Sequence, residues 1–95
     1  MIIRIVRMTL QENKCVEFRS KFENWRSLIS SVPGCMDLQL LGDVDNPAVF
    51  STYSVWESQE FLDNYRKSDI FAEVWPQTKA YFAEKPLAWS SEVLH

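Results

Sequence analysis

The N-terminal segment IIRIVRMTL, residues 2–10, is rich in β-branched residues and predicts a strand with apolar side chains on both faces. The even positions are Ile2, Arg4, Val6, Met8 and Leu10, and the odd positions are Ile3, Ile5, Arg7 and Thr9. A strand of this kind is stable only in a sheet that is covered on both sides. This requirement constrains the fold more than any other feature of the sequence.

The short length of the chain limits how both faces of the sheet can be covered. The 95 residues are expected to form a single domain over 1–95, and a domain of this size buries only a modest fraction of its surface. Yet 46% of the residues are hydrophobic and 14% are aromatic, which is a large apolar load for so short a chain. We therefore expect an aromatic core together with apolar surface that a partner chain buries.

The first half of the chain predicts a helix followed by a hairpin. Residues 13–31 form an amphipathic helix, with Asn13 as its N-cap, and SVPG ends it. Residues 35–42 and 48–56 are strands joined by the turn sequence DVDNP. The helical stripe is Cys15, Phe18, Phe22, Trp25, Ile29 and Val32, and one face of the second strand is Met36, Leu38 and Leu40.

The second half predicts two more helices and a last strand. Ser58 can cap a short helix through about residue 66, and Ser68 can cap a helix that starts at residue 69. Pro76 lacks a backbone donor, so we expect it to kink or break that second helix near Trp75. Residues 85–94 are the final strand.

The resulting order βαββαβ predicts an α+β, ferredoxin-like domain, an antiparallel sheet with its helices on one face. The open face is also apolar, and packing two such sheets together covers it most simply. We therefore expect a homodimer that forms a dimeric α+β barrel.

Several classes of function are not expected. The net charge is −3 with no cluster of Lys and Arg, so nucleic acid is not an expected partner. No apolar run approaches the roughly 20 residues that span a bilayer, and no signal peptide is recognisable, so we expect a cytoplasmic protein.

The residue types that usually hold cofactors are scarce. His95 is the only histidine, and Gly34 and Gly42 are the only glycines, so neither a His-based metal or acid–base site nor a glycine-rich phosphate loop is expected. Cys15 and Cys35 are expected to be reduced, packed as small apolar side chains. We expect no metal and no cofactor.

Three short motifs carry a resemblance to a known family: VWES (55–58), YRKSDIF (65–71) and KPLAWS (85–90). With them the chain resembles the antibiotic biosynthesis monooxygenase superfamily. The resemblance implies a homodimeric barrel with a pocket between each sheet and its helices. Its members include cofactor-free oxygenases of quinols and polycyclic phenols, haem-degrading oxygenases and isomerases.

The resemblance also separates these branches. In the haem-degrading pattern this chain has Val6 in place of an Asn, Tyr65 in place of a Trp and Trp75 in place of the His ligand. An indole nitrogen carries a hydrogen and cannot ligate iron, so haem degradation is the less expected activity. Trp56 matches the Trp of the family's VW.S motif, which implies a place in a substrate pocket.

The function that these points favour is a cofactor-independent monooxygenase acting on a quinol or a polycyclic phenol, with a small aromatic molecule as ligand. The alternative is a non-catalytic dimer that binds small molecules or is structural. The candidate pocket residues are Trp56, Tyr65, Phe71, Trp75, Tyr81 and Arg7.

For each candidate an ordinary structural role remains open. The aromatic residues fit an ordinary core, and Tyr65 fits the helix surface. Arg4 and Arg7 fit a solvated or dimer-rim position, or one of them points among apolar neighbours and stabilises a substrate oxyanion. Asp37 fits either an interface salt bridge or a general base.

Overall fold

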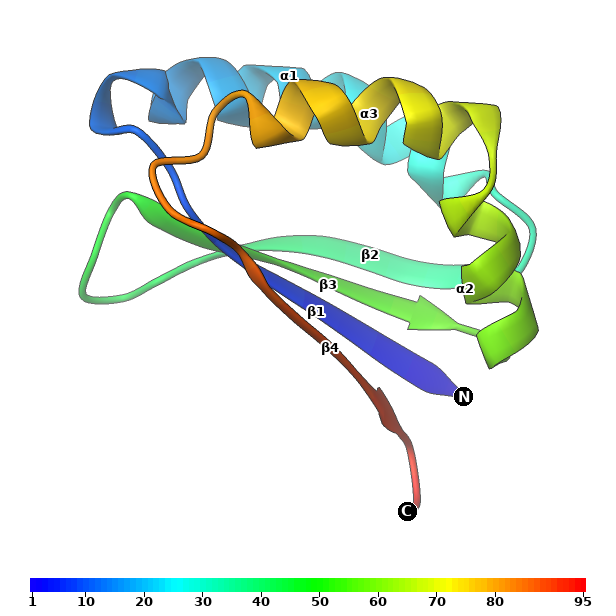
Figure 1. Ribbon diagram of the computed structural model, residues 1–95. Coiled ribbons are helices and arrows are strands. Elements are labelled where there is room, and N and C mark those ends of the chain that lie inside the picture. Colours follow the sequence, from blue (N-terminus) through cyan, green and yellow to red (C-terminus); the bar gives the residue numbers. More distant parts are fainter.

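Four strands pair into one antiparallel sheet in the computed structural model, which describes all 95 residues (Figure 1). Their order across the sheet is β2-β3-β1-β4. The strands are β1 (Ile2–Thr9), β2 (Cys35–Gly42), β3 (Val49–Trp56) and β4 (Leu87–Glu92). The predicted α+β, ferredoxin-like βαββαβ plan is confirmed, and the apolar N-terminal strand lies inside the sheet, between β3 and β4.

All helices lie on one face of this sheet (Figure 1). A 3-10 helix η1 (Glu12–Lys14) leads into α1 (Cys15–Ser30), which lies beside α3 (Asp69–Lys79) over the sheet. The short helix α2 (Gln59–Arg66) follows β3 and packs against both β3 and α3 at one end of the sheet. None of these helices is long and apolar enough to cross a bilayer.

The core lies between α1, α3 and the face of the sheet that they cover. The predicted stripe of α1 supplies its buried side chains Phe18, Phe22, Trp25 and Ile29. The sheet and the C-terminal half supply the remainder, which are Met8, Leu10, Leu38, Phe50, Val74 and Tyr81.

The open face of the sheet carries apolar side chains as well. Ile5 of β1 pairs with Tyr53 of β3 on one side and with Trp89 of β4 on the other. Side chains alternate along a strand, so these three share a face, and it is the face opposite buried Met8. Trp89 is 46% exposed there.

Only one of the three predicted side-chain caps of the helices is formed. Asn13 does not cap α1, because the 3-10 helix η1 occupies residues 12–14 and Lys14 stands at the N-cap with no side-chain bond. Ser68 does cap α3, since its Oγ accepts a hydrogen bond from the backbone N–H of Phe71 at 3.2 Å. Ser58 occupies the N-cap of α2 but makes no such bond.

Of the two outcomes predicted at Pro76, a kink or a break of the helix, the break does not occur. α3 continues through Pro76 to Lys79. The proline removes one backbone donor, and neighbouring side chains add bonds of their own: Gln77 Nε2 donates to the carbonyl of Glu73 at 3.1 Å, and Thr78 Oγ1 donates to that of Val74 at 2.8 Å.

A β-bulge changes which side chains of β2 face the core. The pairing of β2 with β3 shifts register between Cys35 and Asp37, so Met36 is an extra residue in the strand. Met36 is 55% exposed, whereas Cys35 packs against the core. The predicted face of Met36, Leu38 and Leu40 is therefore wrong at its first position.

Candidate functional site

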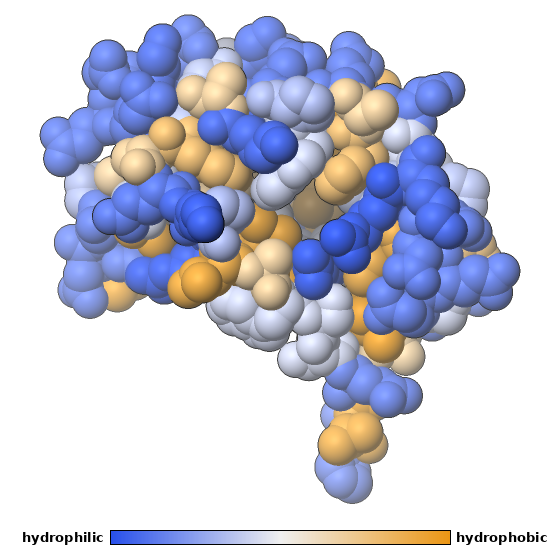
Figure 2. Space-filling view, viewed as in Figure 1, coloured by the Kyte–Doolittle hydropathy of each residue, from blue (hydrophilic) through white to orange (hydrophobic).

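A cavity of about 250 Å³ lies between the helices and the sheet face that they cover. In the space-filling view it is a recess between the helix layer and the sheet, with hydrophobic residues around it (Figure 2). Fourteen of its twenty lining residues are hydrophobic. An apolar hollow of this kind, with a few polar groups, is the usual form of a small-molecule site.

The sheet forms the floor of the cavity with residues from its two central strands. Arg4 and Val6 of β1 pair with Ser54 and Thr52 of β3, and all four line the cavity. Because the strand period is two, these residues share the face of buried Met8.

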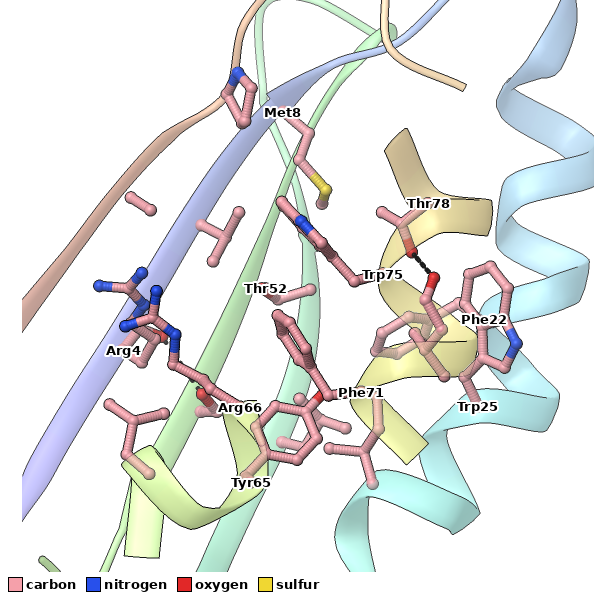
Figure 3. A pocket seen from close by; sticks show the side chains of 18 of the residues that line it. Arg4, Met8, Phe22, Trp25, Thr52, Tyr65, Arg66, Phe71, Trp75 and Thr78 are labelled. Carbon is pink, nitrogen blue, oxygen red and sulfur yellow. Dashed lines mark hydrogen bonds between the residues drawn. The ribbon is translucent and has the colours of Figure 1, made fainter. Parts of the chain in front are cut away.

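A row of aromatic rings forms one wall. The ring of Trp56 stacks on that of Tyr65 with centroids 5.0 Å apart, and Tyr65 meets Phe71 edge to face at 5.2 Å. Phe71 stacks on Trp75 at 5.8 Å, and Trp75 meets Phe82 at 5.8 Å. Figure 3 shows Phe71 and Trp75 projecting from α3 toward the sheet. The first four rings of this row line the cavity, whereas Phe82 does not. We call the row Trp56, Tyr65, Phe71, Trp75 and Phe82 the pocket cluster.

Trp56 is both a core residue and a pocket residue. Its side chain is 1% exposed, and its Nε1–H donates to Ser54 Oγ at 2.9 Å. The hydroxyl of Ser54 donates in turn to the carbonyl of Arg4 at 3.4 Å. Trp56 therefore lies in the cavity lining as a buried ring whose N–H is already bonded.

Tyr65 is held in its neutral form. Burial, together with the nearby thiol of Cys35, raises the pKa of Tyr65 to about 12. At neutral pH it is a phenol that can donate a hydrogen bond, and it is not a phenolate base. Burial also raises the pKa of the Cys35 thiol, so that side chain is not an activated nucleophile.

Two arginines border the cavity, and no carboxylate lines it. Arg4 is half-buried on β1 and Arg66 is the exposed last residue of α2. Burial lowers the pKa of Arg4, and the charge of Arg66 lowers it further. The lining includes no Asp, Glu, His, Lys or Cys, so its only ionisable side chains are Arg4, Arg66 and Tyr65.

Of the six predicted pocket residues, four line the cavity and two lie elsewhere. Trp56, Tyr65, Phe71 and Trp75 are brought together there by β3, α2 and α3. The placement of Arg7 in the pocket was wrong, because its odd position in β1 directs it to the open face of the sheet, where it pairs with Asp43 at 3.7 Å.

Tyr81 does not line the cavity either. It is 7% exposed and its ring contacts that of Phe18 edge to face at 5.9 Å, so it belongs to the core. Asp37 is exposed on β2, and its carboxylate accepts bonds from Leu38 N at 2.9 Å and Gln39 Nε2 at 2.8 Å. It is absent from the cavity lining, which removes its candidacy as the base of this site.

The sequence prediction missed Arg66, Thr52 and Thr78. Arg66 follows Leu62 by one helical turn, and Leu62 is fully buried, so helical spacing placed Arg66 near the buried side of α2. The position of Arg4 among Ile2, Val6 and Met8 likewise carried the signal that separates it from Arg7.

Comparison with known proteins agrees with this architecture. The family model described as antibiotic biosynthesis monooxygenase matches residues 1–76. No protein with a curated description matches the chain.

Solved structures share the fold at low sequence identity. A conserved protein from Methanosarcina mazei Go1 has a TM-score of 0.89 at 20% identity, with 97% of this chain and 92% of that chain covered. A candidate antibiotic biosynthesis monooxygenase from Nitrosomonas europaea has a TM-score of 0.90 at 17% identity, with 100% of both chains covered.

Proposed function

The chain belongs to the antibiotic biosynthesis monooxygenase family, and on that premise we propose that it is a cofactor-independent monooxygenase acting on a small quinol or phenol. The observation that carries the proposal is the cavity itself. It has one aromatic wall for a flat ring and a cationic border for the anion that such a ring forms on losing a proton. Both features match what an oxygen-reactive phenolate or quinolate needs from a protein.

The volume of the cavity narrows the substrate class. At about 250 Å³ it lies just below the range of about 300–1,000 Å³ that is usual for ligand pockets. One or two fused rings suit this space better than the larger polycyclic phenols. We therefore take a naphthalene-sized quinol as the model substrate.

The reaction needs only the substrate and oxygen. The quinolate gives an electron to O₂, and the two radicals join to form a peroxide at a ring carbon. The O–O bond then breaks, one oxygen stays on the ring, and the other leaves as water with the two hydrogens lost from the substrate. For 1,4-dihydroxynaphthalene the balanced products are 2-hydroxy-1,4-naphthoquinone and one water.

The protein contributes position and environment. The pocket cluster excludes water from the reacting ring and stacks on its face. The neutral Tyr65 hydroxyl is available as a hydrogen-bond donor to an oxyanion, and the hydroxyl of Thr52 also lines the cavity.

Oxygen uptake with 1,4-dihydroxynaphthalene, with no added metal or flavin, tests the proposal. We expect uptake above the protein-free rate, and one labelled oxygen in the product when ¹⁸O₂ is used. Ala88→Phe places a ring in the cavity and should abolish the extra rate, whereas Val16→Ala, at an 83% exposed position of α1, should leave it unchanged. Uptake that equals the protein-free rate for a panel of such quinols would refute the proposal.

A second function is favoured by one observation, the absence of any carboxylate, imidazole or amine from the cavity lining. With no proton acceptor, the same site would bind an aromatic molecule without turning it over. Calorimetric binding of the quinol or its quinone, without oxygen uptake above background, would support this alternative over the oxygenase.

We also propose that the protein acts as a homodimer through the open face of its sheet. The row Tyr53, Ile5 and Trp89 gives that face an apolar centre. Sedimentation should give twice the mass of one chain at micromolar concentration, and Trp89→Arg should shift it toward the monomer. A wild-type monomer under these conditions would contradict the proposal.

A further inference from the structure

Two guanidinium groups meet at one side of the cavity. Figure 3 shows Arg4, from the middle of the sheet, next to Arg66, from the end of α2. Their elements are far apart in sequence, and both side chains line the same hollow. Burial lowers the pKa of Arg4, and the nearby charge of Arg66 lowers it further, which places the two positive charges near one another.

Neither arginine has a carboxylate partner. Arg4 Nη1 donates only to the neutral Ser90 Oγ, at 3.2 Å. The one ion pair of the molecule joins Arg7 and Asp43, on the other side of the sheet. Two like charges, one half-buried and one exposed, therefore line the same cavity without a carboxylate beside them, an arrangement that a bound anion would stabilise.

The surroundings define which anion fits. A guanidinium presents a planar fork of N–H donors that suits an oxyanion. The aromatic rings of Tyr65 and Phe71 line the same cavity and offer stacking surfaces for a flat ring. A ligand that satisfies both is a ring with an ionised oxygen attached to it.

We propose that Arg4 and Arg66 form an anion subsite that selects aromatic oxyanions, the conjugate bases of acidic phenols, quinols or hydroxyquinones. The inference rests on the proposed function in sharing its cavity and substrate class. It also supplies what the cavity lacks: by stabilising the bound anion, the two arginines make the ligand more acidic, so its proton can leave to water without a base in the lining.

Calorimetry with two matched compounds at neutral pH tests this subsite without any turnover. 2-Hydroxy-1,4-naphthoquinone is an anion at this pH, whereas 2-methoxy-1,4-naphthoquinone has nearly the same shape and cannot ionise. We expect the anion to bind about tenfold or more tightly than the methoxy compound, the size of one charge-assisted hydrogen bond. Because no reaction is monitored, a failed oxygenase assay and a failed anion preference are separate results.

Substitutions of single arginines test which side chains cause the preference for the anion. Arg66→Gln, at an exposed helix end, and Arg4→Gln should each weaken binding of the anion about tenfold and leave binding of the methoxy compound within about twofold. Arg7→Gln, on the same strand as Arg4 but on its other face, is the matched control and should change neither. If Arg4→Gln fails to fold, Arg66→Gln still decides the question.

Three outcomes would overturn the proposal. They are equal affinity of the wild type for both compounds, no binding of either, and a loss in Arg7→Gln as large as in Arg66→Gln.

Discussion

The chain holds two groups of aromatic rings that are alike in composition and different in packing. In the core group Phe18 touches four other rings, those of Phe22, Trp25, Phe50 and Tyr81, at 5.6–6.4 Å. All five of these side chains are at most 7% exposed. In the pocket cluster each ring touches only its neighbours in a row, and Trp56 alone is fully buried.

The two groups differ in how many neighbouring rings each ring contacts. Rings arranged around a centre fill the space between α1 and the sheet, whereas rings arranged in a row form a wall with a free side. The cavity lies on that free side, and Phe18, Phe22 and Trp25 of the core group also contribute to its lining (Figure 3). Aromatic content alone thus does not distinguish a core from a binding site.

The largest effect is expected from removing the ring at the centre of the core group. Phe18→Ala removes the ring that joins four others and should lower the free energy of unfolding by about 3–5 kcal/mol. Phe71→Ala, in a half-buried wall position, should cost less than half as much. Urea denaturation of the two variants gives both values, and equal losses would remove the distinction between the groups.

The turn after α1 contains Gly34, and its conformation depends on the absence of a side chain at that position. Gly34 has φ of +86°, and a Cβ there would overlap the side chain of Phe61 on α2. Gly34→Ala should therefore cost about 2 kcal/mol or more, from backbone strain and overpacking together. Gly42→Ala is the matched control, because nothing lies within 4 Å of its added methyl group. Comparable thermal unfolding of the two variants would show that the turn is not constrained in this way.

The buried phenol of the pocket cluster, Tyr65, predicts a dependence of stability on pH. The pKa of Tyr65 is about 12 in the folded protein, above the 10.0 of an ordinary tyrosine. The unfolded chain ionises first, so this contribution to stability is complete below pH 10 and is lost as the pH rises toward 12.

The size of this loss is about 2 kcal/mol by pH 12, measured as the change in stability of the wild type relative to Tyr65→Phe. Denaturant titrations at intervals between pH 9 and pH 12 provide it. Parallel curves for the two proteins across that interval would contradict the assignment to Tyr65.

The smallest expected effect concerns the helix that carries the wall. Ser68→Ala removes the bond to Phe71 N and should cost about 1 kcal/mol. Ser58 occupies the same position of α2 without a side-chain bond, so Ser58→Ala should cost a few tenths of a kcal/mol. Chemical denaturation that ranks the two variants in the reverse order would contradict this reading of the caps.

The sequence predicted the fold well because the relevant signals are local. Alternation identified the strands, and the spacing of Phe18, Phe22, Trp25 and Ile29 identified the buried stripe of α1. The errors were also local, in that the bulge at Met36 and the 3-10 turn before α1 inserted irregularities that a strict period does not contain.

The site was harder to predict because its parts meet only in three dimensions. The ring wall was found in part, since Trp56, Tyr65, Phe71 and Trp75 stand in the matching motifs or on one stripe. Of the cationic border, Arg66 was not predicted, and Arg4 was considered only as an alternative to Arg7. A choice between these two arginines of β1 required knowing which face of the sheet the helices cover.

The place of β1 inside the sheet has a consequence for biosynthesis. One of its two pairing partners, β4, follows every other strand and helix of the domain in sequence, so the loop that must close between β1 and β4 is long. A nascent chain that has left the ribosome only as far as α3 therefore has an unpaired edge on β1, which is open to pairing with another chain. Completion of the sheet, and with it protection from aggregation, is expected to wait until residues 87–92 emerge.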